Sequence, residues 1–276
     1  MRRGSRGAGV SIKLGVKTKV KINTAHENEF RIMINGAKTA NAPVSEYVLK
    51  LFSDLTKTKY EAYVDHEVQV PIGSGFGSSG AAALSLALAL NKALKVDLPT
   101  LKAAQLAHLA EIECQTGLGT VAAETQGGFE IRLEPGAPGI GEIKSIPLQG
   151  DWKVICLSFN PISKKILKDP VFRRRTNEAG RRSLREFSAD PTPERFMTIS
   201  RSFSEKLGLI SDRVREALID ADGKDIACSM MMIGEAVFSL IRDERAGGII
   251  DIFRSHSPRT QDILISDIDF EGARLL

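Results

Sequence analysis

The sequence predicts an α+β protein built as two lobes. Its first half is rich in segments that alternate apolar and polar residues, the period of a half-buried strand, and helical patterns follow them. A turn-rich stretch, EPGAPGIG, precedes a boundary near residues 149–150, after which a fresh apolar strand begins. Strands followed by helices in each of two blocks indicate an α+β architecture, and 276 residues are enough for two cores. We therefore expect an N-terminal lobe over 1–149 and a C-terminal lobe over 150–276.

The spacing of apolar residues predicts the strands and helices of the N-terminal half. Residues 10–22, VSIKLGVKTKVKI, alternate apolar and basic side chains and predict a hairpin with a lysine-rich solvent face. Residues 30–34 predict a strand that ends at an Asn-Gly turn. Apolar residues at helical spacing predict a helix over 44–57, and alternation returns over 60–72. The later elements are a helix opening at a glycine loop, a helix over about 101–113, the glycine-spaced loop TGLGTVAAETQGG and the strand FEIRL.

The C-terminal half begins with the apolar strand WKVICLSF. An arginine-rich stretch over 164–185 follows, in which acidic residues dilute the charge and few aromatic residues intervene. These features favour a solvated helix face over a nucleic-acid groove, and a segment that carries arginines toward a phosphate stays open. Helical patterns come next at 193–207 and 209–221, and the strand AVFSLI, an amphipathic helix and the strand DILISDID end the chain.

Composition excludes few functions. The net charge of +4 suits a small acidic substrate as well as it suits nucleic acid. The longest apolar run is too short to span a bilayer, and the first residues do not form a secretory signal. Three isolated cysteines, without a CxxC pair or a Cys/His cluster, favour free thiols in a reducing compartment over disulfides or zinc. We expect a cytoplasmic protein.

The most informative segment is the loop IGSGFGSSG, which runs directly into an alanine- and leucine-rich helix. Backbone N–H groups and the helix dipole at such a junction bind anions, and a serine hydroxyl there can be a ligand of Mg²⁺. The segment over 75–80 also fits GxGxxG of dinucleotide-binding units, with Asp97 about 20 residues beyond Gly77. Against that alternative, the preceding strand alternates, and Asp97 stands between two helices without a buried second strand. The loop is not a Walker A motif, and a helix entry without any ligand is the remaining alternative.

The segment PIGSGFGSSGAAALSLALALN resembles the phosphate-binding motif of the GHMP kinases. Nearly the whole chain is similar to one family among them, the archaeal pantoate kinases, through GSRGAGVSIKLGV, AHLAEIECQTGLGTVAAETQGGFEIRLEPGAPG, PTPERFM, SMMMIGEAVF and DFEGARLL. The resemblance implies an S5-like N-terminal lobe and a ferredoxin-like C-terminal lobe. It also implies ATP-dependent phosphorylation of pantoate to 4-phosphopantoate, a step in coenzyme A biosynthesis.

The resemblance assigns roles to particular residues. The ATP phosphates would lie in the loop formed by Gly73, Ser74, Gly75, Gly77, Ser78, Ser79 and Gly80. Mg²⁺ would be bound by Ser79 and Glu111, with Glu113 as the fallback ligand; on an ideal helix Glu113 lies about 200° around from Glu111. The substrate would contact Ser5, Arg6, His108 and Arg132, whose guanidinium suits a carboxylate.

Three departures from the family pattern stand out. Many GHMP kinases carry an aspartate near the attacking hydroxyl, where this chain has Thr120, so that either the alcohol attacks without a strong base or Glu124 substitutes. Family members have a further strand and loop before GSRGAG, so we expect that this chain lacks the first strand of the lobe. The third glycine-rich motif retains only Gly234; without the resemblance, that segment predicts a methionine-rich helix turning into a strand.

Other functions remain open at this point. One is a different GHMP kinase that acts on shikimate or homoserine, and another is a nucleotide-binding protein with weak catalysis. The third is an NAD-linked oxidoreductase. For the kinase we expect pantoate and ATP as small-molecule partners, no nucleic acid and no membrane, and the family suggests a homodimer.

Overall fold

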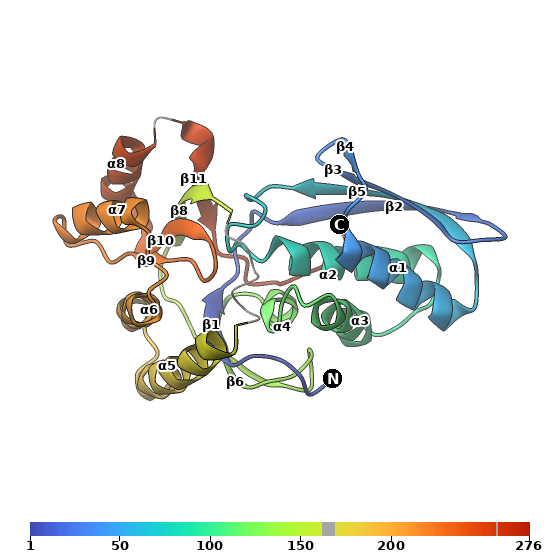
Figure 1. Ribbon diagram of the computed structural model, residues 1–276, viewed down its shortest axis with the longest axis horizontal. Coiled ribbons are helices and arrows are strands. Elements are labelled where there is room, and N and C mark those ends of the chain that lie inside the picture. The colour runs from blue at the N-terminus through green and yellow to red at the C-terminus, as the bar shows by residue number, and fades with distance from the viewer. Residues whose placement is uncertain (162–168, 258) are drawn as a thin grey trace.

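The computed structural model describes residues 1–161, 169–257 and 259–276. Two lobes lie side by side in Figure 1, one with helices α1 to α4 and the other with helices α5 to α8. The α+β class and the two-lobed arrangement are therefore confirmed. No described helix is long and apolar enough to cross a membrane.

The main sheet of the N-terminal lobe has the order β2-β5-β3-β4. Strand β5 pairs antiparallel with β2 and parallel with β3, and β3 turns at the expected Asn-Gly pair into β4. Helices α1, α2 and α3 lie on one side of this sheet, with α3 packed on the other two, and together they bury a core that includes Phe52, Tyr60 and Leu84. The bounds are β2 Val16–Thr24, β3 Glu29–Ile34, β4 Ala37–Thr39, α1 Pro43–Thr56, β5 Tyr60–Val68, α2 Ser78–Ala93 and α3 Thr100–Glu113.

A buried polar group lies between this sheet and its helices. His66 on β5 contacts Thr18 Oγ1 through Nδ1 at 2.8 Å and Ser45 Oγ through Nε2 at 3.0 Å. Thr18 also contacts Ser85 on α2 at 2.6 Å. Burial lowers the pKa of His66 to about 4, because the charged imidazolium would lose its hydration. The ring is therefore neutral near pH 7 and links strand to helix by hydrogen bonds.

A second, smaller sheet has the order β1-β6-β7. Its pairing shows that the hairpin predicted over 10–22 is wrong. The segment over 10–22 is not a hairpin, because β1 (Gly7–Val10) pairs with β6 (Phe129–Glu134), whereas β2 pairs with β5. The alternation is present in β2, but alternation does not identify the partner of a strand. The lobe is completed by α4 (Thr120–Gln126) and β7 (Glu142–Ser145).

The C-terminal lobe has an antiparallel sheet of order β11-β8-β10-β9. Helices α7 and α8 share one core with it, and a second core contains a cluster of phenylalanine rings from β6, α5, α6 and β10. That cluster joins the lobes. The bounds are β8 Trp152–Asn160, α5 Pro170–Ala189, α6 Pro193–Leu207, α7 Asp212–Asp222, β9 Ser229–Met230, β10 Glu235–Arg242, η2 Asp243–Arg245, α8 Ala246–His256, η3 Thr260–Asp262 and β11 Ile263–Asp267.

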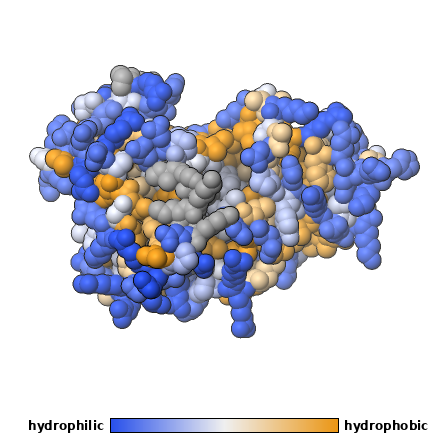
Figure 2. Space-filling view, in the orientation of Figure 1, coloured by the Kyte–Doolittle hydropathy of each residue, from blue (hydrophilic) through white to orange (hydrophobic). Residues whose placement is uncertain are grey.

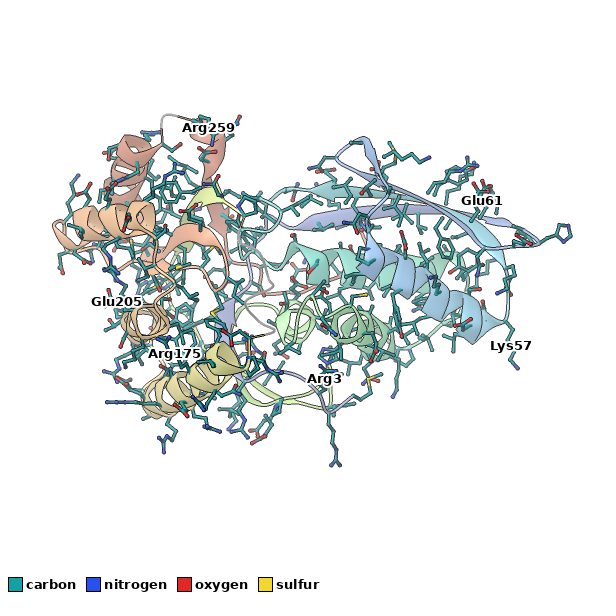
Figure 3. All side chains as sticks on the ribbon, viewed as in Figure 1. Arg3, Lys57, Glu61, Arg175, Glu205 and Arg259 are labelled. Carbon is teal, nitrogen blue, oxygen red and sulfur yellow. The ribbon has the colours of Figure 1, made fainter. Side chains whose placement is uncertain are left out.

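The arginine-rich stretch forms helix α5, apart from residues 162–168, which lie outside the described residues. The helix buries Phe172 and Phe187, while its arginines are exposed. Figure 2 shows hydrophilic side chains along much of the rim of the face in view, and Figure 3 places Arg175 on α5. The described part of the arginine-rich stretch is therefore a helix with a solvated face, as the sequence predicts.

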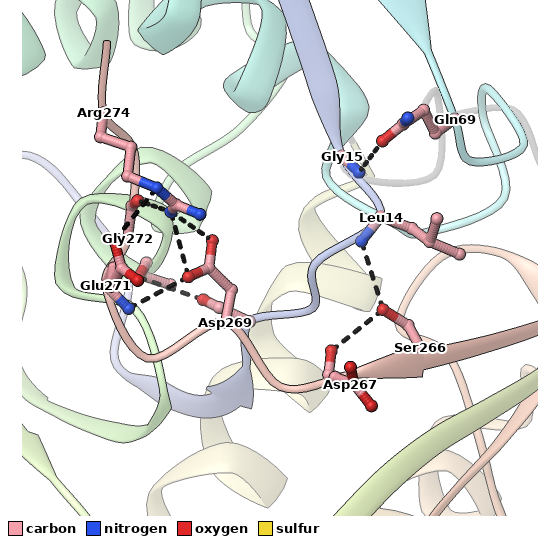
Figure 4. A network of polar contacts seen from close by, with 11 residues as sticks. Leu14, Gly15, Gln69, Ser266, Asp267, Asp269, Glu271, Gly272 and Arg274 are labelled. Carbon is pink, nitrogen blue, oxygen red and sulfur yellow. Dashed lines mark hydrogen bonds and ion pairs between the residues drawn. The ribbon is translucent and has the colours of Figure 1, made fainter. Parts of the chain in front are cut away.

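The chain ends by crossing back from the C-terminal lobe to the N-terminal lobe. We call residues 268–274 the C-terminal strap. Asp269 N–H donates to Ser11 O at 2.9 Å, Gly128 N–H donates to Asp269 O at 2.7 Å, and Ala273 N–H donates to Glu124 O at 2.9 Å. Figure 4 shows how Arg274 holds the strap in a turn through Asp269 and the carbonyl of Gly272. The strap therefore fastens helix α4 to the other lobe.

Candidate active site

The glycine loop connects β5 to helix α2. Gly73, Gly75 and Gly77 have φ values of 82°, 90° and 77°, a region that residues with a side chain rarely adopt. Gly77 N-caps α2 without a side-chain hydrogen bond, and Gly80 N–H returns to Gly77 O at 2.8 Å. The positive end of a 16-residue helix therefore opens onto a loop of bare backbone, which is the local structure that binds phosphate.

The other lobe supports this loop from one side. A Cβ on Gly75 would stand 3.0 Å from Met232 O, and a Cβ on Gly234 would overlap the carbonyl of Ser74. Ser74 itself is buried. The methionine-rich segment is thus a turn between β9 and β10 and not a helix, because its backbone packs on the glycine loop. Gly234 is needed for this close approach of the two backbones.

Helix α4 faces the glycine loop from the opposite side. A Cβ on Gly77 would overlap the methyl group of Thr120 and stand 3.0 Å from Glu124 Oε1. A Cβ on Gly80 would lie 3.1 Å from Glu124 Oε2. That oxygen is inaccessible to solvent and has no hydrogen-bond partner among the described residues. Burial and the nearby Glu111 carboxylate raise the pKa of Glu124 well above its ordinary value.

Glu111 supplies the second carboxylate. It lies on α3 and is only 2% exposed, and Thr116 Oγ1 donates to its Oε1 at 2.6 Å. A Cβ on Gly117 would overlap Glu111 Oε2, so the glycine leaves room for this carboxylate. Two carboxylates and the start of a helix bearing serines offer hard oxygen ligands, the type that Mg²⁺ takes together with phosphate oxygens and water. The unpartnered Glu124 Oε2 and the mutual repulsion of the two acids fit a cation between them.

A second cluster lies where β1 runs beside β6. Arg132 and Glu130 on β6 are opposite Gly7 and Gly9 on β1. A Cβ on Gly119 would overlap Ser5 Oγ and stand 3.1 Å from Arg132 Nε. The hydroxyl of Ser5 and the guanidinium of Arg132 therefore converge beside Gly119, one residue before Thr120.

Arg132 and Glu130 form a buried ion pair. The guanidinium side chain is 14% exposed and Glu130 is fully buried, with Arg132 Nη1 donating to Glu130 Oε1. Arg132 Nε and Glu130 Oε2 are both buried and have no hydrogen-bond partner in the described part of the chain. Burial raises the pKa of Glu130 to about 7, although the positive charge of Arg132 opposes the shift. A buried donor without a partner in the described residues therefore lies beside Gly119, which also borders Ser5.

His108 stabilises the segment that carries Ser5. It is buried on α3, and its Nε2 contacts the carbonyl oxygen of Arg3 at 2.8 Å. Burial lowers the pKa of His108, so the ring is neutral at pH 7 and Nε2–H donates to the carbonyl. His108 therefore positions the backbone two residues before Ser5.

Comparison with known proteins places this geometry in a family. The N-terminal domain of the GHMP kinases matches residues 44–128, the segment with the glycine loop and α4. A pantoate kinase of Thermococcus kodakarensis is 34% identical over 253 residues, covering 89% of this chain and 82% of the relative. The chain belongs to the pantoate kinase family.

Two further comparisons agree. A pantoate kinase of Methanocaldococcus jannaschii is 30% identical over 260 residues, covering 92% of this chain and 90% of the relative. A solved structure described as a phosphotransferase related to the CoA biosynthesis pathway superposes with a TM-score of 0.86 at 32% identity, covering 98% of this chain and 89% of that one. The GHMP kinase fold expected from the sequence is confirmed.

The structure brings together most residues to which the pantoate kinase resemblance assigns roles. The glycine loop, Glu111 and Glu124 form one cluster, and Ser5 and Arg132 form the other. Two candidates lie elsewhere. Arg6 is half-exposed, and its Nη2 donates to both carboxylate oxygens of Glu134. Glu113 is exposed on the far side of α3 from Glu111.

Four features of the site are absent from the sequence-based set. They are Glu130, Thr116, Gly117 and the C-terminal strap. A signal existed for Glu130, because the pattern Glu-x-Arg in FEIRL puts both charges on one face of a strand, and the glycines of GAG alternate in step with it. Thr116 and Gly117 carry no comparable pattern.

The dinucleotide-binding alternative is wrong. The strand before the glycine loop belongs to a mixed sheet, and Asp97 lies in the connection between α2 and α3 with a φ of 56°. A Rossmann unit would continue from the helix into a second parallel strand that ends at the acid. In the pantoate kinase family the same loop belongs to the GHMP N-terminal domain.

Proposed function

We propose that this chain transfers the γ-phosphoryl group of ATP to the hydroxyl of pantoate, giving 4-phosphopantoate and ADP. One observation carries the proposal: the segment 117–124 contacts both clusters. Gly117 borders Glu111 and Thr120 borders Gly77, while Gly119 between them borders Ser5 and Arg132. A triphosphate on the glycine loop and an anionic acceptor beside Arg132 would therefore meet across this segment, as phosphoryl transfer requires.

The phosphate end of ATP fits the start of α2. The loop residues from Gly73 to Gly80 offer backbone N–H groups, and the helix dipole favours negative charge there. Glu111 and Glu124, with Ser79 at the helix start, would hold Mg²⁺ bound to the nucleotide. The cation supplies charge neutralisation for the phosphates, and it also relieves the repulsion between the two carboxylates.

The acceptor end fits a small carboxylic acid. Arg132 has Nε free of protein partners in the described residues, and a guanidinium binds a carboxylate through two parallel donors. Ser5 adds a hydroxyl donor beside it, and His108 holds the backbone before Ser5. These groups would orient pantoate with its hydroxyl toward the glycine loop.

The attacking alcohol has no strong base at Thr120. We propose that its oxygen attacks the γ-phosphorus directly, that the bond to the leaving ADP oxygen breaks, and that the proton passes to the transferred phosphoryl group. The loose transition state of phosphoryl transfer permits this order. If Glu124→Gln lost several orders of magnitude in kcat while pantoate and Mg·ATP still bound, Glu124 would instead be the base.

An ADP-release assay with D-pantoate, shikimate and homoserine in parallel tests the proposed substrate. We expect turnover with pantoate and little with the others. Turnover with shikimate or homoserine alone would assign a different GHMP kinase activity. Tight binding of Mg·ATP in calorimetry, with no turnover on any hydroxy acid, would indicate a nucleotide-binding protein with weak catalysis.

We also propose that the protein acts in the cytoplasm. All three cysteines are free, and Cys156 and Cys228 are buried. Burial raises the pKa of the Cys228 thiol to about 12, which keeps it protonated and unreactive. Cell fractionation with an antibody against the chain tests the location.

A further inference from the structure

Glu130 is a fully buried acid that the proposed reaction does not use. It lies two residues before Arg132 on β6, so the two side chains share one face of the strand. Isolated buried carboxylates are costly, and this one retains an oxygen, Oε2, without a hydrogen-bond partner among the described residues. Packing alone does not account for a carboxylate in this position, because an apolar side chain would fill the same space at lower cost.

The surroundings of Glu130 are shaped to hold this pair. Opposite it, a Cβ on Gly9 would stand 3.0 Å from Glu130 Oε1, and opposite Arg132 a Cβ on Gly7 would stand 2.8 Å from Nη2. Both glycines of β1 thus leave space that the charged side chains occupy. All four residues of β1 pair antiparallel with β6, and this pairing keeps Gly7 opposite Arg132 and Gly9 opposite Glu130.

The bond between the pair selects one edge of the guanidinium. Glu130 accepts from Nη1, while Nε is buried and has no partner in the described part of the chain. Nε lies beside the same Gly119 that borders Ser5. With Nη1 occupied, the edge that carries Nε and Nη2 is left for a ligand, and two adjacent donors of this kind match the two oxygens of a carboxylate.

A second acid on the same strand shows that the pairing is selective. Glu134 ends β6 beyond a shift of register, and it is exposed and pairs with Arg6. Arg132 stands two residues from each acid in the sequence, and it bonds only the buried acid in the described structure. The buried bond to Glu130 holds Arg132 inside the site, where its side chain is 14% exposed.

We propose that Glu130 is a positioning residue, which fixes the Arg132 guanidinium with its Nε–Nη2 edge toward the substrate carboxylate. The inference rests on the proposed function, because it takes the substrate carboxylate to be the ligand of Arg132. Glu130 does not touch the substrate. Its effect is confined to the binding of the acceptor acid and does not extend to ATP.

The test compares Glu130→Gln with the matched variant Glu134→Gln. The control makes the same chemical change four residues further along β6. Removing a charged hydrogen bond to Arg132 should raise the KM for pantoate about 10-fold to 100-fold. The KM for ATP and kcat should stay within about threefold, since the phosphate cluster is untouched. Glu134→Gln should leave all three constants near those of the wild type.

A second variant reaches the same residue by another route. Gly9→Ala puts a methyl group against Glu130 Oε1 without changing any charge, so it should also raise the KM for pantoate. Gly15→Ala, where the added Cβ has no neighbour within 4 Å, is its control. In a double-mutant cycle, Glu130→Gln should add little to the defect of Arg132→Lys, because both changes remove the same bidentate contact.

Two outcomes overturn the inference. One is an unchanged pantoate KM in Glu130→Gln, and the other is an equal rise in the KM values for pantoate and ATP, which would mark a purely structural role. Failure of the proposed function is a separate result, because the wild-type protein would then not phosphorylate pantoate at all. Should Glu130→Gln fail to fold, Gly9→Ala and the Arg132→Lys kinetics decide the matter.

Discussion

Gly117 leaves open the space that Glu111 Oε2 occupies: a Cβ at position 117 would overlap that oxygen. The glycine lies in the connection between α3 and α4, and Thr116 just before it donates a hydrogen bond to the other oxygen of the same carboxylate. The Thr116 hydroxyl and the glycine at 117 therefore fix the two oxygens of the Glu111 carboxylate.

Gly117→Ala should displace the Glu111 carboxylate. We expect kcat/KM for ATP to fall about 100-fold, because a shift of about 1 Å in a positioning group costs that much. Pantoate affinity should change little. Steady-state kinetics at varied Mg²⁺ measure the effect, with Gly15→Ala as the control, and wild-type kinetics in Gly117→Ala would contradict the assignment of Glu111 to the metal.

Glu124→Gln should stabilise the ligand-free protein and weaken its use of Mg·ATP. The raised pKa means that the ionised carboxylate is disfavoured in its buried place beside Glu111. A neutral amide removes this repulsion, so the Tm without ligand should rise. The Mg²⁺ concentration needed for half-maximal rate should rise as well. A lower Tm with unchanged Mg²⁺ dependence would show that Glu124 has a structural role only.

His66 should make the fold weaker at mildly acidic pH. Its pKa is about 4 in the folded protein and about 6.5 in an unfolded chain, so between these values the unfolded state binds more protons. The stability that the neutral ring contributes is present above about pH 6.5 and is lost as the pH falls toward 4, by up to about 3 kcal/mol. Urea unfolding of the wild type and His66→Gln at pH 4.5 and pH 7 measures the difference, and parallel pH slopes would refute it.

Arg274→Ala should loosen the C-terminal strap without unfolding the protein. Arg274 holds the turn of the strap through exposed bonds to Asp269, which contribute at most about 1 kcal/mol. The amides of Gly128 and Ala273, which bond across the strap, should therefore exchange with deuterium faster, whereas amides in α1 should not. Exchange rates equal to the wild type would show that the backbone bonds hold the strap alone.

The sequence predicted the helices and strands whose pattern is local. The helix over 44–57, the Asn-Gly turn and the helix over 101–113 are confirmed within a residue or two. The predicted hairpin failed because β1 and β2 pair with strands at least 36 residues away. Helix α4 was missed because seven residues between glycines are too few to show a helical period.

The same limit applies to the site. The glycine loop is a local motif and could be found, while the choice between Glu111 and Glu113 needed burial, which is 2% exposure for the first and an exposed position for the second. Contacts such as Gly119 with Ser5, or Ala273 with Glu124, join residues more than 100 positions apart. Contacts of this kind leave no periodic pattern of apolar residues in the sequence from which they could be predicted.

The strap also sets an order of events during synthesis. The carbonyl of Glu124 receives its bond from Ala273, some 150 residues later in the chain. During translation, the residues of the N-terminal lobe up to position 149 are synthesised long before Ala273. Until then helix α4 lacks the hydrogen bond from the Ala273 amide. The carbonyl of Glu124 therefore gains this hydrogen bond only after the second lobe has been translated.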